Sequence, residues 1–231
     1  RGEPTDDHDG NLLLDHLVGA DITYMPGRGY NQNLPAEIER VTREYAKNGD
    51  QAFVIPIGAS DEIGLWGYLA ACEELKNDFS ECQISPDYIV SATGSGGTAG
   101  GLILGNNVFD LGAEVISFNV CDDKAHFINK ITEDYIAWQD RYDQPAFALD
   151  LPINIVEGYV GPGYGIAGPE IYGTISDLAK TEGIILDPVY TGKAFHGLVT
   201  ELKQGRLKSN NQIVFIHTGG IFGIFPHRSH F

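Results

Sequence analysis

Apolar residues along the chain follow two spacings that divide it into short strands and longer helices. Runs that are apolar almost throughout predict strands buried on both faces, and apolar residues three and four positions apart predict helices that cover them. The predicted strands are 21–25, 87–90, 114–120, 152–156 and 212–216. The predicted helices are 11–18, 34–48, a helix capped by Ser60 or Asp61 that ends near 77, one that begins near 100, 122–141, 170–182 and 191–204.

This alternation of strands and helices predicts an α/β fold with a mostly parallel open sheet and helices on both faces. A second region starts near Ala52, which divides the chain into residues 1–50 and 51–231. In sheets of this kind, ligands bind where the strands end at their carboxyl side. We therefore expect the functional residues in the loops after the strands.

The glycine-rich stretch between the strand at 87–90 and the next helix predicts an anion site. It reads Ser91-Ala-Thr-Gly-Ser-Gly-Gly-Thr-Ala-Gly-Gly101 and carries no charge. A strand that passes through such a turn into a helix presents free backbone N–H groups to a phosphate, and hydroxyl groups add donors. The candidate phosphate-binding residues are Thr93, Gly94, Ser95, Gly96, Gly97 and Thr98. The alternative is a tight strand–helix connection without a ligand.

The residues in and after the glycine-rich stretch narrow the kind of phosphate. No Gly-Lys-Ser/Thr sequence comes after it, which argues against a P-loop. Gly94-Ser-Gly96-Gly-Thr-Ala99 matches a loose dinucleotide fingerprint, and Asp122 or Asp123 lies where an acid could bind a ribose. A nicotinamide-binding domain therefore stays open as an alternative from a different class.

Charge and cysteine content restrict the partners and the compartment. The chain of 231 residues has 15 basic and 32 acidic residues and a formal charge of −17. This charge disfavours nucleic acid and anionic membranes, because it repels phosphate backbones. Three cysteines without metal-ligand spacing indicate a reducing compartment, and we expect a cytoplasmic location. No apolar run is long enough to cross a bilayer, and no secretory signal opens the chain.

Four loops rich in glycine and small polar residues carry the strongest sequence signal. They are Thr93 to Thr98, Gly161-Pro-Gly-Tyr-Gly-Ile166, Asp187-Pro-Val-Tyr-Thr-Gly-Lys193 and His217-Thr-Gly-Gly220. Together they resemble the family of pyridoxal-phosphate enzymes that contains D-cysteine desulfhydrase and 1-aminocyclopropane-1-carboxylate deaminase, which has the tryptophan-synthase-β-like fold. The resemblance extends from Gly10-Asn-Leu-Leu-Leu-Asp15 through Val54-Ile-Pro-Ile-Gly58 to Phe222-Gly-Ile-Phe225.

The resemblance implies a cofactor and roles for single residues. Pyridoxal 5′-phosphate would be the cofactor, with its phosphate in the glycine loop. Tyr164 and Tyr190 match the two active-site tyrosines, where a phenol can relay a proton; the alternative for each is packing without a catalytic role. Thr191 and Thr218 match positions that face the pyridine nitrogen. Residues 1–50 would be the remainder of the small α/β domain and 51–231 the large cofactor-binding domain.

The family's Schiff-base lysine and its Ser-Asn-His segment lie in an N-terminal region that we expect to be absent from this chain. Arg1 opens the sequence and Met25 is its single methionine, which is typical of a part of a longer product. Lys193 also occurs in the family, at a helix start, and we interpret it as structural. We therefore expect the 231 residues alone to be inactive and the complete enzyme to be a homodimer.

The choice between the two activities rests on the ring-facing residues. The deaminase branch has an acid after the motif tyrosine, whereas this chain has Thr191 there. A hydroxyl leaves the ring nitrogen neutral, which is sufficient for the loss of a good leaving group such as sulfide. The sequence therefore predicts a carbon–sulfur lyase that forms pyruvate and ammonia from a small amino-acid substrate, D-cysteine. The alternatives are the deaminase, another sulfur-amino-acid lyase such as one acting on cysteate, and an inactive fragment.

Overall fold

The computed structural model describes residues 8–144, 146–208 and 211–231. The chain forms two compact units, Arg1–Pro56 and Ile57–Phe231. The division falls after Pro56, and the assignment of 1–50 and 51–231 to a small and a large domain stays a prediction.

The described part of the first unit contains two helices, α1 (Gly10–Leu17) and α2 (Tyr30–Lys47). The strand predicted at 21–25 was wrong, because residues 20–26 have no regular structure. A strand needs a neighbour for its backbone hydrogen bonds, and the described residues of this unit supply none. Helix α2 begins four residues earlier than the sequence predicted, directly after Gly29, whose φ of 78° sets the turn into the helix.

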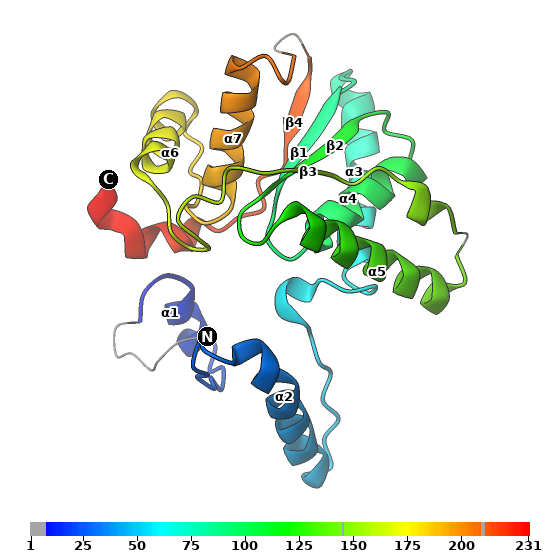
Figure 1. Ribbon diagram of the computed structural model, residues 1–231, viewed down its shortest axis with the longest axis vertical. Coiled ribbons are helices and arrows are strands. Elements are labelled where there is room, and N and C mark those ends of the chain that lie inside the picture. Colours follow the sequence, from blue (N-terminus) through cyan, green and yellow to red (C-terminus); the bar gives the residue numbers. More distant parts are fainter. Residues whose placement is uncertain (1–7, 145, 209–210) are drawn as a thin grey trace. The chain divides into compact units, whose positions relative to one another are not determined.

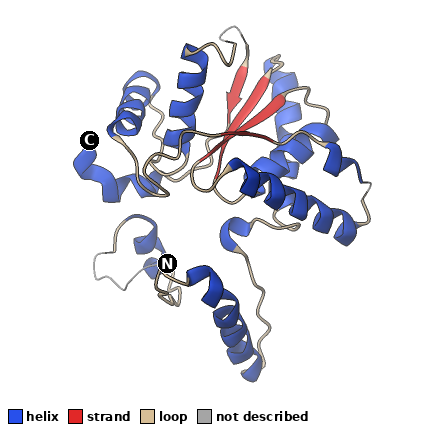
Figure 2. Ribbon diagram, viewed as in Figure 1, coloured by secondary structure: helices blue, strands red, loops and turns tan. Residues whose placement is uncertain are grey.

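The second unit is built on a sheet of four parallel strands (Figure 2). Its spatial order is β3 (Asn154–Val156), β2 (Glu114–Asn119), β1 (Tyr88–Thr93) and β4 (Ile213–Phe215). Val90 in the centre pairs with Ile116 of β2 and Phe215 of β4. This arrangement confirms the predicted parallel α/β fold.

Helices cover both faces of this sheet (Figure 1). One face packs against α3 (Leu65–Cys82), α4 (Gly97–Val108) and α5 (Lys124–Tyr142), and the other against α7 (Thr191–Lys203), which packs on α6 (Pro169–Glu182). Alternate residues of β1 serve the two cores: Ile89 belongs to the cluster with α3, α4 and α5, and Val90 to the cluster with α7. Among the described residues, no helix combines the length and the apolar character needed to cross a membrane.

Short 3₁₀ segments complete the second unit, at Ile57–Ala59, Ala146–Asp150 and Ile221–His230. Helix α3 begins at Leu65, later than a cap at residue 60 or 61 would place it. The Asp61 carboxylate accepts the N–H groups of Ile63 and Gly64 at 3.0 and 2.7 Å, so it caps the turn that leads into the helix. The Ser60 hydroxyl contacts the start of α4 instead.

Helices α3 and α4 approach each other closely because α4 presents glycines to α3. An ideal Cβ on Gly101 would lie 2.6 Å from the Tyr68 Cβ and 2.9 Å from the Leu65 carbonyl oxygen, and one on Gly105 would lie 2.6 Å from Cys72. Any side chain at these positions would push the two helices apart. The start of α4, which carries the glycine loop, is therefore held in place by packing along its length.

We predict that Gly101→Ala lowers the free energy of unfolding by about 1–3 kcal/mol, because its methyl group overlaps α3. The control is Gly67→Ala, since an ideal Cβ there meets no atom within 4 Å. That change should leave the stability unchanged or raise it by up to about 1 kcal/mol through helix propensity. Urea denaturation of both variants measures the difference. Equal stabilities would show that the close approach has no energetic weight.

Candidate active site

The glycine loop lies between the end of β1 and the start of α4. Thr93 is the last residue of β1, and Gly96 precedes the first helical residue, Gly97, with a φ of 96° that favours glycine. The Thr93 hydroxyl oxygen is buried and has no hydrogen-bond partner among the described residues. A buried hydroxyl without a partner is unfavourable unless a ligand or water satisfies it.

Most N–H groups of this loop also lack an acceptor. From Ser95 to Ala99, only the Gly97 N–H has one among the described residues, the Ser60 hydroxyl oxygen at 3.1 Å. The Ser60 hydroxyl in turn lies 2.6 Å from the Ser95 hydroxyl. Free amides at a helix start, together with the unpaired Thr93 hydroxyl, fit a phosphate group.

Tyr164 and Tyr190 come together beside this loop. Their hydroxyl groups form a hydrogen bond, and their rings lie edge to face with centroids 5.8 Å apart. The Tyr190 ring also lies against the glycine loop, because an ideal Cβ on Gly94 would be 2.8 Å from its Cε1 atom. The structure therefore joins three predicted site residues from three separate loops.

The two tyrosines differ in environment. Tyr164 is 51% exposed, whereas Tyr190 is partly buried. Burial, followed by the hydrogen bond with Tyr164, raises the pKa of Tyr190 well above its ordinary value. Tyr190 is therefore protonated at neutral pH and can act as a hydrogen-bond or proton donor.

Thr191 is placed differently from the expectation that its hydroxyl is available to a ring nitrogen. The residue is fully buried, and its hydroxyl donates to the Asp187 carboxylate at 2.6 Å and accepts the Asp187 N–H at 3.0 Å. The same carboxylate accepts the N–H groups of Val189 and Tyr190, each at 2.8 Å. Asp187 therefore caps the start of α7 and fixes Tyr190, and the cofactor role of Thr191 stays a prediction.

Thr218 lies in the loop that approaches Asp187 from the other side. It is exposed, and its predicted role likewise stays a prediction. The loop is close to Asp187 because Gly220 has a φ of 88° and an ideal Cβ there would lie 2.9 Å from the Asp187 Cγ atom. The Asp187 side chain thus lies close to both the loop of Tyr190 and the loop of Thr218.

The loop that carries Tyr164 is held by helix α7. Lys193 is buried, and its ammonium group donates to the carbonyl oxygens of Val160 at 2.7 Å and Gly163 at 2.9 Å. Burial lowers the pKa of Lys193. These contacts agree with the interpretation of Lys193 as structural.

Two turns further along the same side of α7, Glu201 binds the start of this loop. Its carboxylate accepts the Tyr159 hydroxyl and pairs with Arg206. Gly197 lies between Lys193 and Glu201 on the helix and allows α7 to approach Tyr159, since an ideal Cβ there would lie 3.1 Å from the Tyr159 ring. Residues 193, 197 and 201 recur at intervals of four, so they form one stripe along the helix.

Cys121 is a further neighbour of the loop that the sequence pattern did not mark. Its thiol donates to the Gly94 carbonyl oxygen at 3.3 Å. Burial raises its pKa to about 11, so it is a thiol at neutral pH.

The Asp123 carboxylate accepts the His126 N–H at 2.8 Å, so this residue serves as the N-cap of α5. Asp123 is therefore engaged as a cap and is not free to bind a ribose.

The fold and this site define the class of the protein, and a comparison of families agrees. Residues 4–219 match the family model of pyridoxal-phosphate dependent enzymes. The chain belongs to this family, whose members use pyridoxal phosphate as the cofactor. The unpaired amides and the Thr93 hydroxyl are the groups here that fit its phosphate.

Individual relatives narrow the family further. The chain is 37% identical to a Thermotoga maritima protein assigned as a 1-aminocyclopropane-1-carboxylate deaminase, covering 94% of this chain and 66% of that protein. It is 34% identical to the mitochondrial bifunctional D-cysteine desulfhydrase/1-aminocyclopropane-1-carboxylate deaminase of Arabidopsis thaliana, covering 94% of this chain and 53% of that protein. The chain thus spans about two thirds and about half of these curated relatives.

Solved structures show the same relationship. The crystal structure of an ACC deaminase homologue superposes with a TM-score of 0.80 at 31% identity, covering 98% of this chain and 66% of that one. The serine racemase of Dictyostelium discoideum, at 14% identity and a TM-score of 0.56, shares the fold. The expected family and its tryptophan-synthase-β-like fold are confirmed.

We predict that Tyr164→Phe lowers the pKa of Tyr190, since it removes the hydrogen bond that helps to keep the phenol protonated. The value should stay above the ordinary 10.0, because burial is the larger cause. Carbon-13 NMR of tyrosine Cζ atoms across an alkaline titration measures it, with Tyr190→Phe to assign the signal. The control is Tyr45→Phe in α2. A Tyr190 signal that titrates identically with and without Tyr164 would contradict the pairing.

We predict that Lys193→Met loosens residues 159–165, because two carbonyl groups lose their donor. Amide hydrogen exchange in this segment should accelerate by about tenfold or more, as expected for hydrogen bonds to a charged group. The same change at the exposed Lys203, near the end of α7, is the control. Unchanged exchange at 159–165 would show that Lys193 does not hold the loop.

Proposed function

We propose that the protein is a pyridoxal-phosphate dependent lyase that eliminates sulfide from D-cysteine, with pyruvate and ammonia as the other products. The reaction consumes one water and balances as D-cysteine plus water to hydrogen sulfide, pyruvate and ammonia. One supporting fact is the 34% identity to the bifunctional Arabidopsis thaliana enzyme, whose name includes this activity.

The observation that carries the proposal is the contact of Tyr164 with Tyr190 directly beside the glycine loop. The glycine loop would hold the phosphate of the cofactor, and the two phenols are the side chains beside that loop which could act on a bound substrate. Bound pyridoxal phosphate supplies an electron sink that stabilises negative charge at the substrate's α carbon. The free amides between Ser95 and Ala99, with that of Gly97 already bound to Ser60, would hold the phosphate and so orient the reacting part.

The tyrosine pair moves the proton that this reaction needs. Tyr190 is protonated at neutral pH, so it acts first as a donor, to the departing sulfur or to the substrate carboxylate. Tyr164 is exposed and its hydroxyl is bonded to that of Tyr190, so it passes a proton from the solvent to Tyr190 after Tyr190 has donated its own. The Tyr190 N–H donates to the Asp187 carboxylate and the Lys193 ammonium group donates to the loop, and these hydrogen bonds hold both phenols in place.

Thr191 supports elimination over ring opening as the preferred reaction. Its position comes directly after the motif tyrosine, where an acid would protonate the ring nitrogen and deepen the electron sink. The nearby Asp187 carboxylate is occupied by three backbone N–H groups and the Thr191 hydroxyl, so it serves as a cap. A shallower sink is adequate for a thiolate leaving group.

The second candidate is 1-aminocyclopropane-1-carboxylate deaminase activity. The specific observation in its favour is the 37% identity to the Thermotoga maritima protein assigned that activity, together with a 34% identical Pyrococcus furiosus protein with the same assignment. Both activities need the same phosphate loop and the same pair of tyrosines. The difference between them lies in the ring-nitrogen environment.

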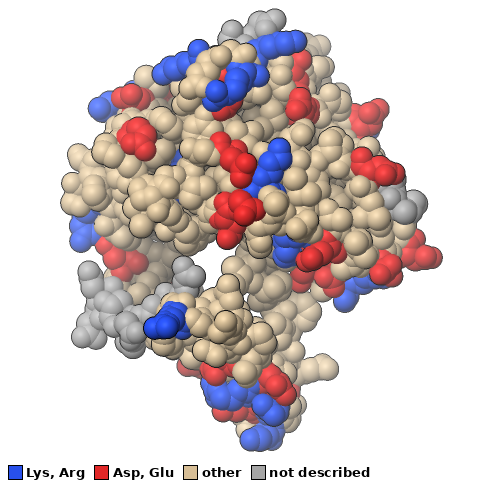
Figure 3. Space-filling view, in the orientation of Figure 1, with Lys and Arg blue, Asp and Glu red and all other residues tan. Residues whose placement is uncertain are grey.

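We propose a small amino acid as the substrate, a second copy of the chain as the partner, and the cytoplasm as the location. The charge distribution supports the absence of nucleic acid among the partners. Acidic and basic side chains intermix on the face shown in Figure 3, where the described residues form no continuous basic stretch. The net charge of −17 repels nucleic acid as a whole.

The test is an assay of the full-length protein with pyridoxal phosphate and D-cysteine, L-cysteine or 1-aminocyclopropane-1-carboxylate as separate substrates. We expect sulfide and pyruvate in equal amounts from D-cysteine. Release of 2-oxobutanoate from the cyclopropane acid without sulfide from D-cysteine would support the deaminase instead. Binding of NADH without uptake of pyridoxal phosphate would overturn both proposals.

Tyr190→Phe in the same protein should lower kcat by about 10²-fold or more, the usual effect of losing a positioned acid–base group. Cofactor binding, monitored by absorbance, should be retained, because the phosphate loop is unchanged. Tyr88→Phe is the matched control, since Tyr88 lies at the start of β1, away from the loops at its far end. Full activity of Tyr190→Phe would remove the phenol from the mechanism.

A further inference from the structure

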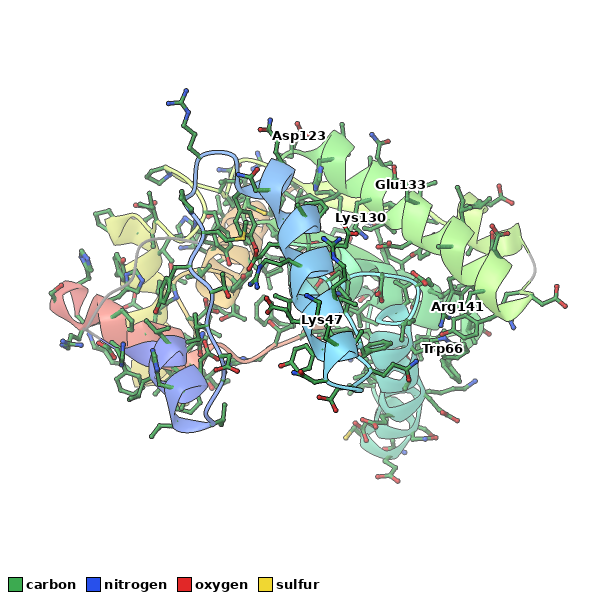
Figure 4. All side chains as sticks on the ribbon, turned by 90° about the horizontal axis from the view of Figure 1, so that it is seen from below. Lys47, Trp66, Asp123, Lys130, Glu133 and Arg141 are labelled. Atoms are coloured by element: carbon green, nitrogen blue, oxygen red, sulfur yellow. The ribbon has the colours of Figure 1, made fainter. Side chains whose placement is uncertain are left out.

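Lys130 of helix α5 binds the segment around Ser60, which contacts the start of α4. The Lys130 ammonium group lies 2.8 Å from the Ser60 carbonyl oxygen and 2.5 and 2.6 Å from the two Asp134 carboxylate oxygens. Figure 4 marks Lys130 and Arg141 on the same helix, α5. Three acceptors thus surround one ammonium group, which has three N–H donors.

The Lys130–Asp134 pair is placed where charge is costly. Asp134 is buried, and this burial raises the pKa of its carboxyl group, while the hydrogen bond with Lys130 opposes the rise. A partly buried ion pair is favourable only when its remaining donors and acceptors are satisfied. The Ser60 carbonyl oxygen completes the set for Lys130, which ties Ser60 to α5 across 70 residues of sequence.

Ser60 in turn contacts the glycine loop through its side chain. Its hydroxyl accepts the Gly97 N–H at 3.1 Å and binds the Ser95 hydroxyl at 2.6 Å. An ideal Cβ on Gly97 would lie 2.7 Å from the Ser60 hydroxyl oxygen, so the two segments are in close contact. The aliphatic part of Lys130 also lines the loop, with its Cγ atom 3.5 Å from an ideal Cβ on Gly96.

We propose that Lys130 and Asp134 are positioning residues for the phosphate site, acting through Ser60. The pair fixes the Ser60 carbonyl, which sets the Ser60 hydroxyl against Gly97 and Ser95. One amide of the loop is thereby occupied by protein, and the amides around it are held apart in a shape that accepts an anion. The inference rests on the proposed function, because it assigns the anion as the cofactor's phosphate.

The first experiment needs no ligand. Amide hydrogen exchange of the full-length protein without cofactor is measured at residues 96–99 in Lys130→Met. Exchange at Gly97 should accelerate by about tenfold, because the Ser60 carbonyl loses its hydrogen bond to the Lys130 ammonium group and no longer fixes the Ser60 hydroxyl against Gly97. Arg141→Met on the same helix is the control, because it removes an equal charge from an exposed pair with Glu62. Unchanged exchange at Gly97 in Lys130→Met would overturn the proposal.

The second experiment compares two ligands that differ only in the phosphate. Lys130→Met should bind pyridoxal 5′-phosphate about tenfold more weakly, with the affinity for pyridoxal unchanged. Equal weakening for both ligands would indicate a merely structural pair and would also overturn the proposal. Arg141→Met accounts for the general effect of one lost positive charge on anion binding.

A double-mutant cycle with Ser60→Ala tests the route. If Lys130 acts through Ser60, the two changes together should weaken phosphate binding no more than the larger single change. Additive effects would overturn the route through Ser60.

Should Lys130→Met fail to fold, Asp134→Asn keeps the side-chain shape and should still accelerate exchange at Gly97. A wild-type protein that binds neither ligand refutes the proposed function, whereas the exchange experiment still decides on the positioning pair.

Discussion

Free backbone N–H groups at the start of α4 are the constraint on which the site depends. The first turn of any helix leaves such donors without partners inside the helix. Here the protein itself supplies only the Ser60 hydroxyl, to Gly97, among the described residues. Glycine is required around this point because Tyr190 presses against Gly94 and Ser60 against Gly97. The loop is thus shaped by close neighbours and keeps its remaining donors for an anion.

Helix α7 organises the other half of the site. Asp187 caps its first turn and fixes the backbone of Tyr190, while Lys193 and Glu201, on one stripe of the helix, hold the loop that carries Tyr164. The two phenols therefore meet because a single helix positions the chain segments of both. Burial, together with the hydrogen bond to Tyr164, raises the pKa of Tyr190, so its phenol is protonated at neutral pH.

Two lysines near the site bind backbone carbonyl groups. A net charge of −17 gives no general attraction for a phosphate, so binding of one depends on local groups such as the free amides and the Thr93 hydroxyl of the glycine loop. Lys193 and Lys130 each donate to carbonyl oxygens of loops that carry or contact site residues. The two ammonium groups thus fix loops, while the free backbone N–H groups of the glycine loop remain open to a ligand.

The sequence by itself determined the features that depend on local pattern, which are the order of strands and helices in the second unit and the glycine-rich turn between β1 and α4. Predictions from the sequence were wrong where a contact with another segment of the chain decides the local structure. Residues 21–25 are apolar enough for a strand but pair with no strand among the described residues, and helix α3 begins at Leu65 instead of directly after Ser60 or Asp61. Only the tertiary structure brought Lys130 to Ser60 and Tyr164 to Tyr190. Periodicity reports which face of an element is buried, whereas contacts across tens of residues depend on how the elements pack.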